Sequence, residues 1–177
     1  MRARRASGAQ REEAVTAVQP ATIDLRAPFG DASKRAILYL VYDEQGVVDD
    51  YIPHALRSLR PFAEHILVIV NGEPQEAGRA ALEAVADDVL VRENVGFDVW
   101  GYKEGLAHLG DRVDEFDEVI LMNYTFFAPV RPFEPVFAAM DARDDIDFWG
   151  ITDHGSVTPH PYHLRGTMPS HIQSHWI

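Results

Sequence analysis

Residues 92–106 read Arg92-Glu-Asn-Val-Gly-Phe-Asp-Val-Trp-Gly-Tyr-Lys-Glu-Gly-Leu106, and residues 118–129 read Glu118-Val-Ile-Leu-Met-Asn-Tyr-Thr-Phe-Phe-Ala-Pro129. The first stretch is typical of a strand that ends at Arg92 and a tight polar turn that opens a helix near Asp98. The second is typical of an apolar strand that ends abruptly at Asn123. Ligands of open α/β sheets bind beyond the carboxyl ends of the strands. Two polar strand ends in succession therefore predict a small-molecule site at that edge.

The same alternation of strand and helix extends over the rest of the chain. Short apolar runs, as in buried parallel strands, occupy residues 37–42, 65–70, 88–92, 118–122 and 147–151. Apolar residues at helical spacing lie between them, and in the third helix these are Val99, Tyr102, Leu106 and Leu109. We predict an α/β fold with a doubly wound, mostly parallel sheet of about five strands and helices on both faces.

The chain divides into two predicted regions. Residues 1–35 are rich in Ala, Arg, Gln and Ser without sustained periodicity, which predicts a mobile N-terminal leader. Residues 36–177 form a single predicted α/β domain. It ends in Gln173-Ser-His-Trp-Ile177, which looks like the middle of an element. We therefore expect the natural protein to continue and this domain to be truncated.

Charge and composition narrow the class of protein. The 177 residues carry 16 Lys and Arg against 28 Asp and Glu, a formal net charge of −12. So acidic a chain repels polyphosphate backbones, which disfavours nucleic acid as a partner. The chain has no cysteine, which excludes disulfides and fits a reducing compartment. No apolar run approaches the roughly 18 residues of a membrane span. We expect a cytoplasmic protein, with peripheral contact to the inner face of the membrane as an option.

The first candidate site group is Asn94, Gly96 and Asp98, on the turn that opens the third helix. Gly96 would allow a positive φ angle or a close backbone approach to a ligand. Asp98 could accept hydrogen bonds from the hydroxyls of a ribose or a sugar. The alternative is an ordinary turn in which Asp98 only caps the helix.

The second candidate group is Asn123 and Thr125. They lie where many nucleotide-sugar enzymes hold a divalent cation between two carboxylates and a diphosphate. Mg²⁺ and Mn²⁺ favour charged oxygen ligands, and both positions here are neutral. We therefore predict no metal site formed by the protein itself. Any Mg²⁺ or Mn²⁺ would be held mainly by the diphosphate of a donor. The alternative is a strand-end turn that uses Asn123 for local hydrogen bonds.

Further candidates lie at the ends of other predicted strands. Asp43 and Asn71 follow the first two strands on the same edge, where each could meet a nucleobase or ribose or be an ordinary loop residue. Asp153 follows the fifth predicted strand and is our candidate for a general base. His171 and His175 are four residues apart, as in helical zinc sites, but prolines interrupt helix in this segment. We interpret these two residues as loop histidines.

Two other patterns bear on function. Six aromatic residues near these segments are interpreted as core rather than as a sugar platform: Trp100, Phe126, Phe127, Phe133, Phe148 and Trp149. No Gly-x-Gly-x-x-Gly follows the first strand, and no Gly-Lys-Ser/Thr loop occurs. Their absence argues against NAD and P-loop chemistry.

The order and spacing of several short motifs resemble one known family. These motifs are Tyr39-Leu-Val-Tyr-Asp43, Asp50-Tyr51, Val68-Ile-Val-Asn71, Arg92-Glu-Asn-Val-Gly-Phe-Asp98, Leu121-Met-Asn123, Pro129, Trp149-Gly-Ile-Thr152 and His171-Ile-Gln-Ser174. From about Ile37 to Ile177 the chain resembles the rhamnan synthesis protein F family. Tyr124 departs from the small or acidic residue that the family commonly has there, which weakens the case for a metal.

The resemblance implies a glycosyltransferase with an A-type-like fold, acting in the synthesis of bacterial envelope polysaccharide or lipopolysaccharide. It implies a nucleotide-sugar donor, with dTDP-L-rhamnose as a candidate, and a glycan acceptor. Asn94, Gly96 and Asp98 would belong to the donor site, and Asn123 and Thr125 to the diphosphate position. The alternative is a non-catalytic module that binds a nucleotide sugar or scaffolds polysaccharide assembly. The enzymatic reading requires the turn at Gly96 and the strand end at Asn123 to converge.

Overall fold

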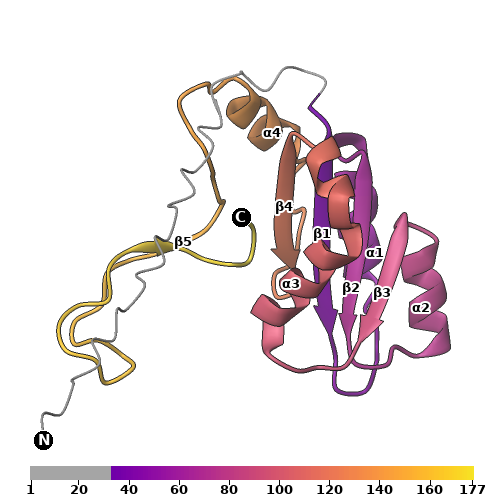
Figure 1. Cartoon of the computed structure of the whole chain (residues 1–177), viewed down its shortest axis with the longest axis horizontal. Helices are drawn as coiled ribbons and strands as arrows, with labels where there is room; N and C mark the ends of the chain where they lie inside the picture. Colours follow the sequence, from indigo (N-terminus) through magenta and orange to yellow (C-terminus); the bar gives the residue numbers. More distant parts are fainter. Residues whose placement is uncertain (1–32) are drawn as a thin grey trace, which may run out of the picture.

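The computed structural model describes residues 33–177, which are organised around a four-stranded parallel sheet (Figure 1). The strands are β1 (Arg35–Tyr42), β2 (His65–Asn71), β3 (Asp88–Arg92) and β4 (Glu118–Asn123). Their order in the sheet is β3-β2-β1-β4. Most of the predicted leader, residues 1–32, lies outside the described residues, and Arg35 at its end is the first residue of β1.

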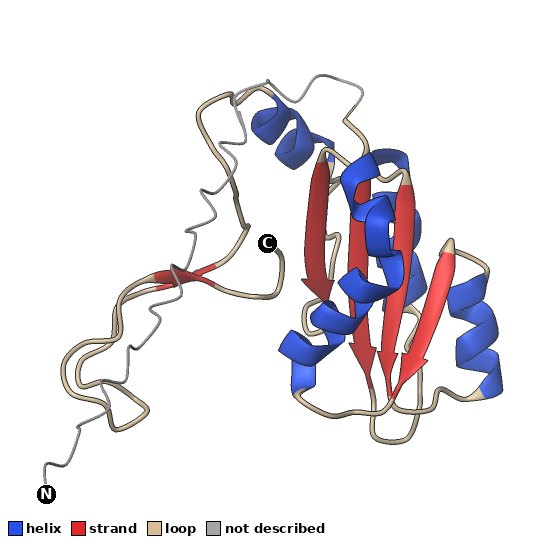
Figure 2. Ribbon diagram, in the orientation of Figure 1, coloured by secondary structure: helices blue, strands red, loops and turns tan. Residues whose placement is uncertain are grey.

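Helices cover both faces of the sheet (Figure 2). The helices are α1 (Tyr51–Leu59), α2 (Glu76–Glu83), α3 (Phe97–Leu109) and α4 (Glu134–Asp141), with short 3-10 helices η1 (Arg60–Phe62) and η2 (Gly110–Glu115). Side chains alternate along a strand, so β1 buries Tyr39 against the face of α1, α2 and α4 and Leu38 against the face of α3. Continuous apolar runs of this kind are what a sheet covered on both faces requires.

The strand order places the reversal of the topology between β1 and β4. The chain moves from β1 to β2 to β3 in one direction, and α3 then carries it back across the sheet to β4 on the other side of β1. Every neighbouring pair of strands is parallel. The predicted doubly wound α/β fold is therefore confirmed, with four strands in the main sheet.

Glycines, rather than the predicted apolar stripe, bring α3 onto the sheet. A Cβ atom on Gly101 would lie 2.3 Å from Cδ1 of Leu40, and one on Gly105 would lie 2.4 Å from Cδ1 of Ile69. Tyr102 and Leu109 are buried as predicted, whereas Val99 and Leu106 are exposed. The predicted stripe is wrong at Val99 and Leu106. Because α3 approaches the sheet closely at its two glycines, these two side chains face solvent.

The predicted fifth strand at residues 147–151 is also wrong. This segment forms no strand, and its Trp149 packs into an aromatic cluster with Phe137 and Trp176. The free edge of β4 is instead occupied by the C-terminal tail, residues 174–177, which runs antiparallel to it. The Leu121 N–H donates to the Ile177 carbonyl at 2.7 Å, and the Ile177 N–H donates back at 2.9 Å.

Between Trp149 and the tail the chain forms an extended arm. Its two short strands, β5 (Asp153–His154) and β6 (His171–Ile172), pair antiparallel, away from the main sheet (Figure 1). Within residues 33–177 no helix has the length and apolar character needed to cross a membrane.

Candidate functional site

The end of β4 and the start of α3 meet at the carboxyl edge of the sheet. Asn123 is the last residue of β4, and Asp98 lies in the first turn of α3. The Asn123 side-chain amide, Nδ2, donates a hydrogen bond to Oδ2 of Asp98 at 3.0 Å. Asn123 is only 2% exposed. The two segments that the sequence predicts to converge are therefore in direct contact, beside the point where the strand order reverses.

The turn before α3 requires the glycine at its centre. Gly96 has φ +75°, and a Cβ atom there would lie 2.7 Å from Cβ of Trp100. Phe97 follows with φ +53° although it is not a glycine, and its side chain is 79% exposed. Such left-handed backbone costs a non-glycine residue roughly 1–2 kcal/mol. Gly96 holds the N-cap position of α3, so the Asp98 carboxylate is not the cap of this helix.

Thr125 and the C-terminal tail complete the cluster around Asn123. Oδ1 of Asn123 accepts hydrogen bonds from the Thr125 backbone N–H at 3.2 Å and from the Thr125 hydroxyl at 2.6 Å. The same hydroxyl lies 2.8 Å from Nδ1 of His175. The tail reaches this position because the Asn123 N–H donates to the His175 carbonyl at 3.2 Å. We refer to Asp98, Asn123, Thr125 and His175 as the edge cluster.

His175 is the member of the edge cluster that the sequence analysis missed. We had interpreted it as a loop histidine. It lies beside Thr125 because the tail pairs with β4. A contact between residues 50 positions apart cannot be predicted from local spacing. The burial of Trp176, which has no exposed surface, fixes the neighbouring backbone and so keeps His175 at the edge.

Asp43 lies on the same edge and has a local role. Its Oδ1 accepts the backbone N–H groups of Gln45 at 2.8 Å and Val47 at 3.0 Å, as an aspartate that orders its own turn does. Burial raises the pKa of Tyr124, and the charges of Asp98 and Asp43 raise it further. Asp43 directly follows β1, which pairs parallel with β4, so Asp43 lies at the same edge of the sheet as the edge cluster.

Asn71 is buried at the end of β2, and the protein itself uses its side-chain oxygen. Oδ1 of Asn71 accepts a hydrogen bond from Nη1 of Arg92. Arg92 also binds Glu104 at 2.8 Å and the carbonyl of Val95 at 2.7 Å. This arrangement ties the ends of β2 and β3 to the turn that carries Asn94, whose side chain is exposed. Asn71 thus supports the turn from below, while Asn94 faces solvent.

Asp153 is not part of the edge cluster. It is exposed on β5, where it pairs across the arm with Ile172. Among residues 33–177, no hydrogen bond or ion pair joins its side chain to Asp98, Asn123 or Thr125. Next to it, the rings of His154 and His171 stack with centroids 5.4 Å apart.

Some of the aromatic residues that the sequence predicts to be core residues are exposed in the structure. Phe133 is buried and Trp149 is partly buried against the core, as predicted. Trp100, Phe127 and Phe148 are 46%, 75% and 69% exposed, so the core interpretation is wrong for these three. Nζ of Lys103 lies 4.5 Å from the centroid of the Trp100 ring. The ring centroids of Phe127 and Tyr51 are 4.4 Å apart. The rings of Trp100 and Phe127 are therefore accessible to solvent near the carboxyl edge, whereas Phe148 lines a cavity at the opposite end of β4.

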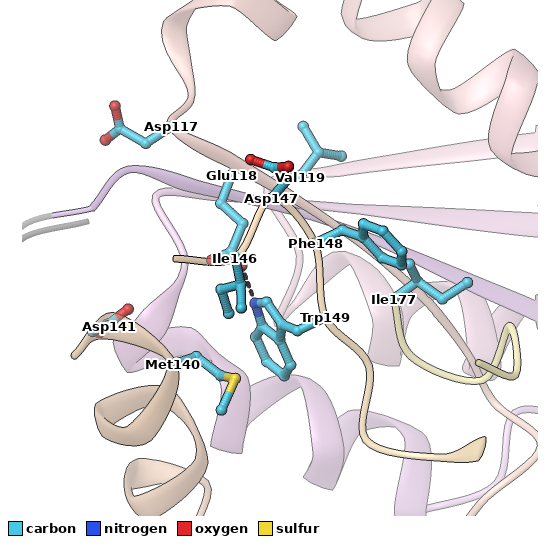
Figure 3. A pocket seen from close by; sticks show the side chains of 10 residues that line it. All are labelled: Asp117, Glu118, Val119, Met140, Asp141, Ile146, Asp147, Phe148, Trp149 and Ile177. Carbon is cyan, nitrogen blue, oxygen red and sulfur yellow. Dashed lines mark hydrogen bonds between the residues drawn. The ribbon is translucent and has the colours of Figure 1, made fainter. Parts of the chain in front are cut away.

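A cavity of about 180 Å³ lies at the opposite end of β4 from Asn123 (Figure 3). Glu118, Asp117 and Asp141 are among its lining residues, and Nε1 of Trp149 donates to Glu118 at 2.5 Å. The four acidic residues of its lining, Asp117, Glu118, Asp141 and Asp147, would repel a diphosphate. Nucleotide ligands of open sheets lie at the carboxyl edge. The edge cluster is therefore the better candidate for a nucleotide-sugar site.

The side chains of residues 33–177 can be compared with those that a metal ion needs. No group of three or more His, Cys, Asp or Glu side chains in residues 33–177 is placed to hold one. At the edge, the amide oxygen of Asn123 is already bonded to Thr125. The side chains present do not form a set of charged oxygen ligands of the kind that Mg²⁺ and Mn²⁺ prefer.

Comparison with known proteins yields one family. Residues 66–177 match rhamnan synthesis protein F, a stretch that begins in β2 and includes the whole edge cluster. No curated protein matches the chain. The family match supports a role in rhamnan synthesis and hence in polysaccharide biosynthesis. Because the match covers more than half of its residues, the chain belongs to the rhamnan synthesis protein F family.

Proposed function

We propose that the chain is a glycosyltransferase that moves a sugar from a nucleotide-diphosphate donor to a hydroxyl group of a glycan acceptor in bacterial envelope polysaccharide synthesis. The hydrogen bond between Asp98 and Asn123 carries this proposal. It joins two polar side chains at the carboxyl edge, beside the reversal of strand order between β1 and β4. This is where open α/β sheets bind nucleotides. Membership of the rhamnan synthesis protein F family supports dTDP-L-rhamnose as the first donor to test.

Asp98 has the role of orienting the donor sugar. A carboxylate accepts hydrogen bonds from sugar hydroxyls, and Asn123 fixes its position from below. Correct orientation of a bound substrate can contribute several kcal/mol to catalysis. The exposed residue Asn94 and the backbone at Gly96 lie on the same turn and can line the donor.

The diphosphate leaving group needs compensation of its negative charge. The amino end of α3 presents free backbone N–H groups and the positive end of the helix dipole. Thr125 lies at the same edge, where Asn123 and His175 already occupy its hydroxyl. Mg²⁺ or Mn²⁺ would have to bind mainly through the diphosphate itself. Asp43 extends the proposed rim on the side of β1, while the buried Asn71 supports the turn before α3 through Arg92.

A base must also accept the proton of the attacking hydroxyl. Asp153 is one candidate because its carboxylate is exposed and it follows the sheet in sequence. In this role Asp153 requires the arm to approach the edge when the acceptor binds. Asp153→Asn, which keeps the shape of the side chain and removes its basicity, tests this assignment through the rate of sugar transfer.

The decisive experiment measures donor binding and turnover together. Thermal unfolding is followed with a panel of sugar nucleotides, with and without Mn²⁺, and released nucleoside diphosphate is then quantified. We expect stabilisation and turnover by wild type, and loss of both in Asp98→Ala. Equal binding and turnover by wild type and Asp98→Ala would exclude the role given to this residue.

A binding module is the second candidate function. The neutral sequence Asn123-Tyr-Thr125 favours it. So does the lack, within residues 33–177, of a group of His, Cys, Asp or Glu side chains placed to hold a metal. On this alternative the chain binds a nucleotide sugar or scaffolds polysaccharide assembly without catalysis. Stabilisation by a sugar nucleotide without any release of nucleoside diphosphate supports the module over the enzyme.

A further inference from the structure

We infer that His175, in place of Asp153 on the arm, is the base that accepts the proton of the acceptor hydroxyl, with Nε2 as the reacting atom. The inference rests on the proposed glycosyltransferase function and names a residue of the same site. It starts from the hydrogen bonds of Asn123, continues through Thr125 and ends at the imidazole ring.

The first step fixes the orientation of the Asn123 amide. Nδ2 faces Oδ2 of Asp98 at 3.0 Å and the carbonyl of Ser174 at 3.4 Å. An ionised carboxylate and a carbonyl can only accept hydrogen bonds. The NH₂ group must therefore point toward them, and Oδ1 must point toward Thr125.

The second step fixes the proton of the Thr125 hydroxyl. Its oxygen lies 2.6 Å from Oδ1 of Asn123, which can only accept, and 2.8 Å from Nδ1 of His175. A hydroxyl has one proton to donate. The shorter contact takes that proton, so the hydroxyl oxygen accepts a hydrogen bond from Nδ1–H of His175.

The third step gives the state of the histidine. A neutral imidazole that carries its proton on Nδ1 has a lone pair on Nε2. Within residues 33–177, Nε2 of His175 makes no hydrogen bond, and it is not among the buried polar atoms that lack a partner. The basic nitrogen is therefore open to solvent at the carboxyl edge. The ring of Phe126 packs edge-on against the imidazole at 6.4 Å and limits its rotation.

The reaction follows from this arrangement. The acceptor oxygen forms a bond to the anomeric carbon, while the bond from that carbon to the diphosphate oxygen breaks. The electron pair leaves with the nucleoside diphosphate, and the hydroxyl proton moves to Nε2 of His175. The imidazolium that forms remains hydrogen-bonded through Nδ1–H to Thr125.

The test combines His175→Asn with a matched control. The asparagine amide can replace Nδ1–H toward Thr125 but provides no base in place of Nε2. His163→Asn is the control, because His163 is exposed on the arm and has φ +59°, a conformation that asparagine tolerates. We expect His175→Asn to keep the donor-induced thermal shift and to lose about 10²–10⁴-fold in transfer rate. The control should retain the wild-type rate.

Two readouts separate this inference from the proposed function. Nitrogen NMR of wild type should show His175 protonated on Nδ1 and not on Nε2, and the acid limb of the rate profile should disappear in His175→Asn. A proton on Nε2, or transfer by His175→Asn at the wild-type rate, overturns the role of His175 while the glycosyltransferase stands. No turnover of any sugar nucleotide by wild type overturns both.

Discussion

Asn123 at the end of β4 donates a hydrogen bond to Asp98 in the first turn of α3 across 3.0 Å. This contact links the two chain segments that flank the reversal of strand order. A hydrogen bond to a charged group contributes about 1.5–3 kcal/mol when buried, and partial exposure of Asp98 reduces that value. We expect a coupling energy of about 1–2 kcal/mol between the two side chains in a double-mutant cycle.

The cycle compares Asp98→Ala, Asn123→Ala and the double variant by urea unfolding. Asn123→Ala should cost more than Asp98→Ala, because it also removes the acceptor of the Thr125 hydroxyl and of the Thr125 backbone N–H. Effects of the two single variants that add to within about 0.5 kcal/mol would show that the contact does not stabilise the edge.

Trp176 anchors the tail that forms one side of the candidate site. Its ring has no exposed surface and contacts Phe133 at 5.2 Å, Phe137 at 5.7 Å and Trp149 at 5.8 Å. We expect Trp176→Ala to lower the free energy of unfolding by about 3–5 kcal/mol, through lost burial and an empty cavity.

Hydrogen exchange supplies the specific readout for Trp176→Ala. The backbone N–H groups of Leu121 and Asn123 donate to the tail, so they should exchange faster when the tail detaches. Trp100→Ala is the matched control. Trp100 is half-exposed and packs on Lys103, a contact worth about 0.5–1 kcal/mol. Unchanged protection of Leu121 and Asn123 in Trp176→Ala would contradict the anchoring role.

Much of the sheet could be predicted from the sequence because its signals are local. The apolar runs of β1 and β2 are buried on both faces of the sheet, and those of β3 and β4 are partly buried at its edges. The contact between Asp98 and Asn123 could be predicted as well, since Asn123 ends β4 and Asp98 opens the helix that follows β3. Once the strands are parallel and α3 crosses back to β4, the topology itself places these residues together.

The errors all depend on contacts between distant parts of the chain. The run 147–151 looks like a strand, but the edge of β4 is already paired with residues near Ile177. Helical spacing predicts that Val99 is a core residue. In the structure α3 contacts the sheet through Gly101 and Gly105, and a search for apolar spacing does not identify glycines as contact residues. His175 was missed for the same reason: its neighbours come from a strand 50 residues earlier.

Gly105 should not tolerate a methyl group. The Cβ atom of Gly105→Ala would lie 2.4 Å from Cδ1 of Ile69 and 3.1 Å from Cδ2 of Leu38. Alanine favours the helix by about 1 kcal/mol, but the overlap should outweigh this gain and destabilise the protein by about 1–3 kcal/mol. Urea unfolding measures the change.

Ile69→Val provides the control for this prediction because it removes the Cδ1 atom that the new methyl group would meet. Alone it should cost about 0.5–1.5 kcal/mol. Together with Gly105→Ala it should cost less than the sum of the two single changes. Simple addition would show that the two sites do not touch and that α3 is not held by this contact.

Acid should destabilise the protein through His65 at the start of β2. Its Nε2 is buried without a partner, and burial, followed by the positive charge of Arg112, lowers the pKa of His65 against the opposing effects of Asp87 and Asp88. The unfolded chain therefore binds a proton at His65 more readily than the folded chain does. Stability contributed by the neutral ring is present above the unfolded pKa of about 6.5 and is lost as the pH falls below it.

The measurement is urea unfolding of wild type and His65→Leu at pH 7.5, 6.5 and 5.5. The leucine keeps an apolar side chain at this buried position and cannot bind a proton. Wild type should lose more stability than His65→Leu as the pH falls, by at most about 1.4 kcal/mol per pH unit, the limit for one proton. Parallel loss in the two proteins would mean that His65 binds its proton equally well in the folded and unfolded chain, and that its unpaired nitrogen meets water at the amino end of the sheet.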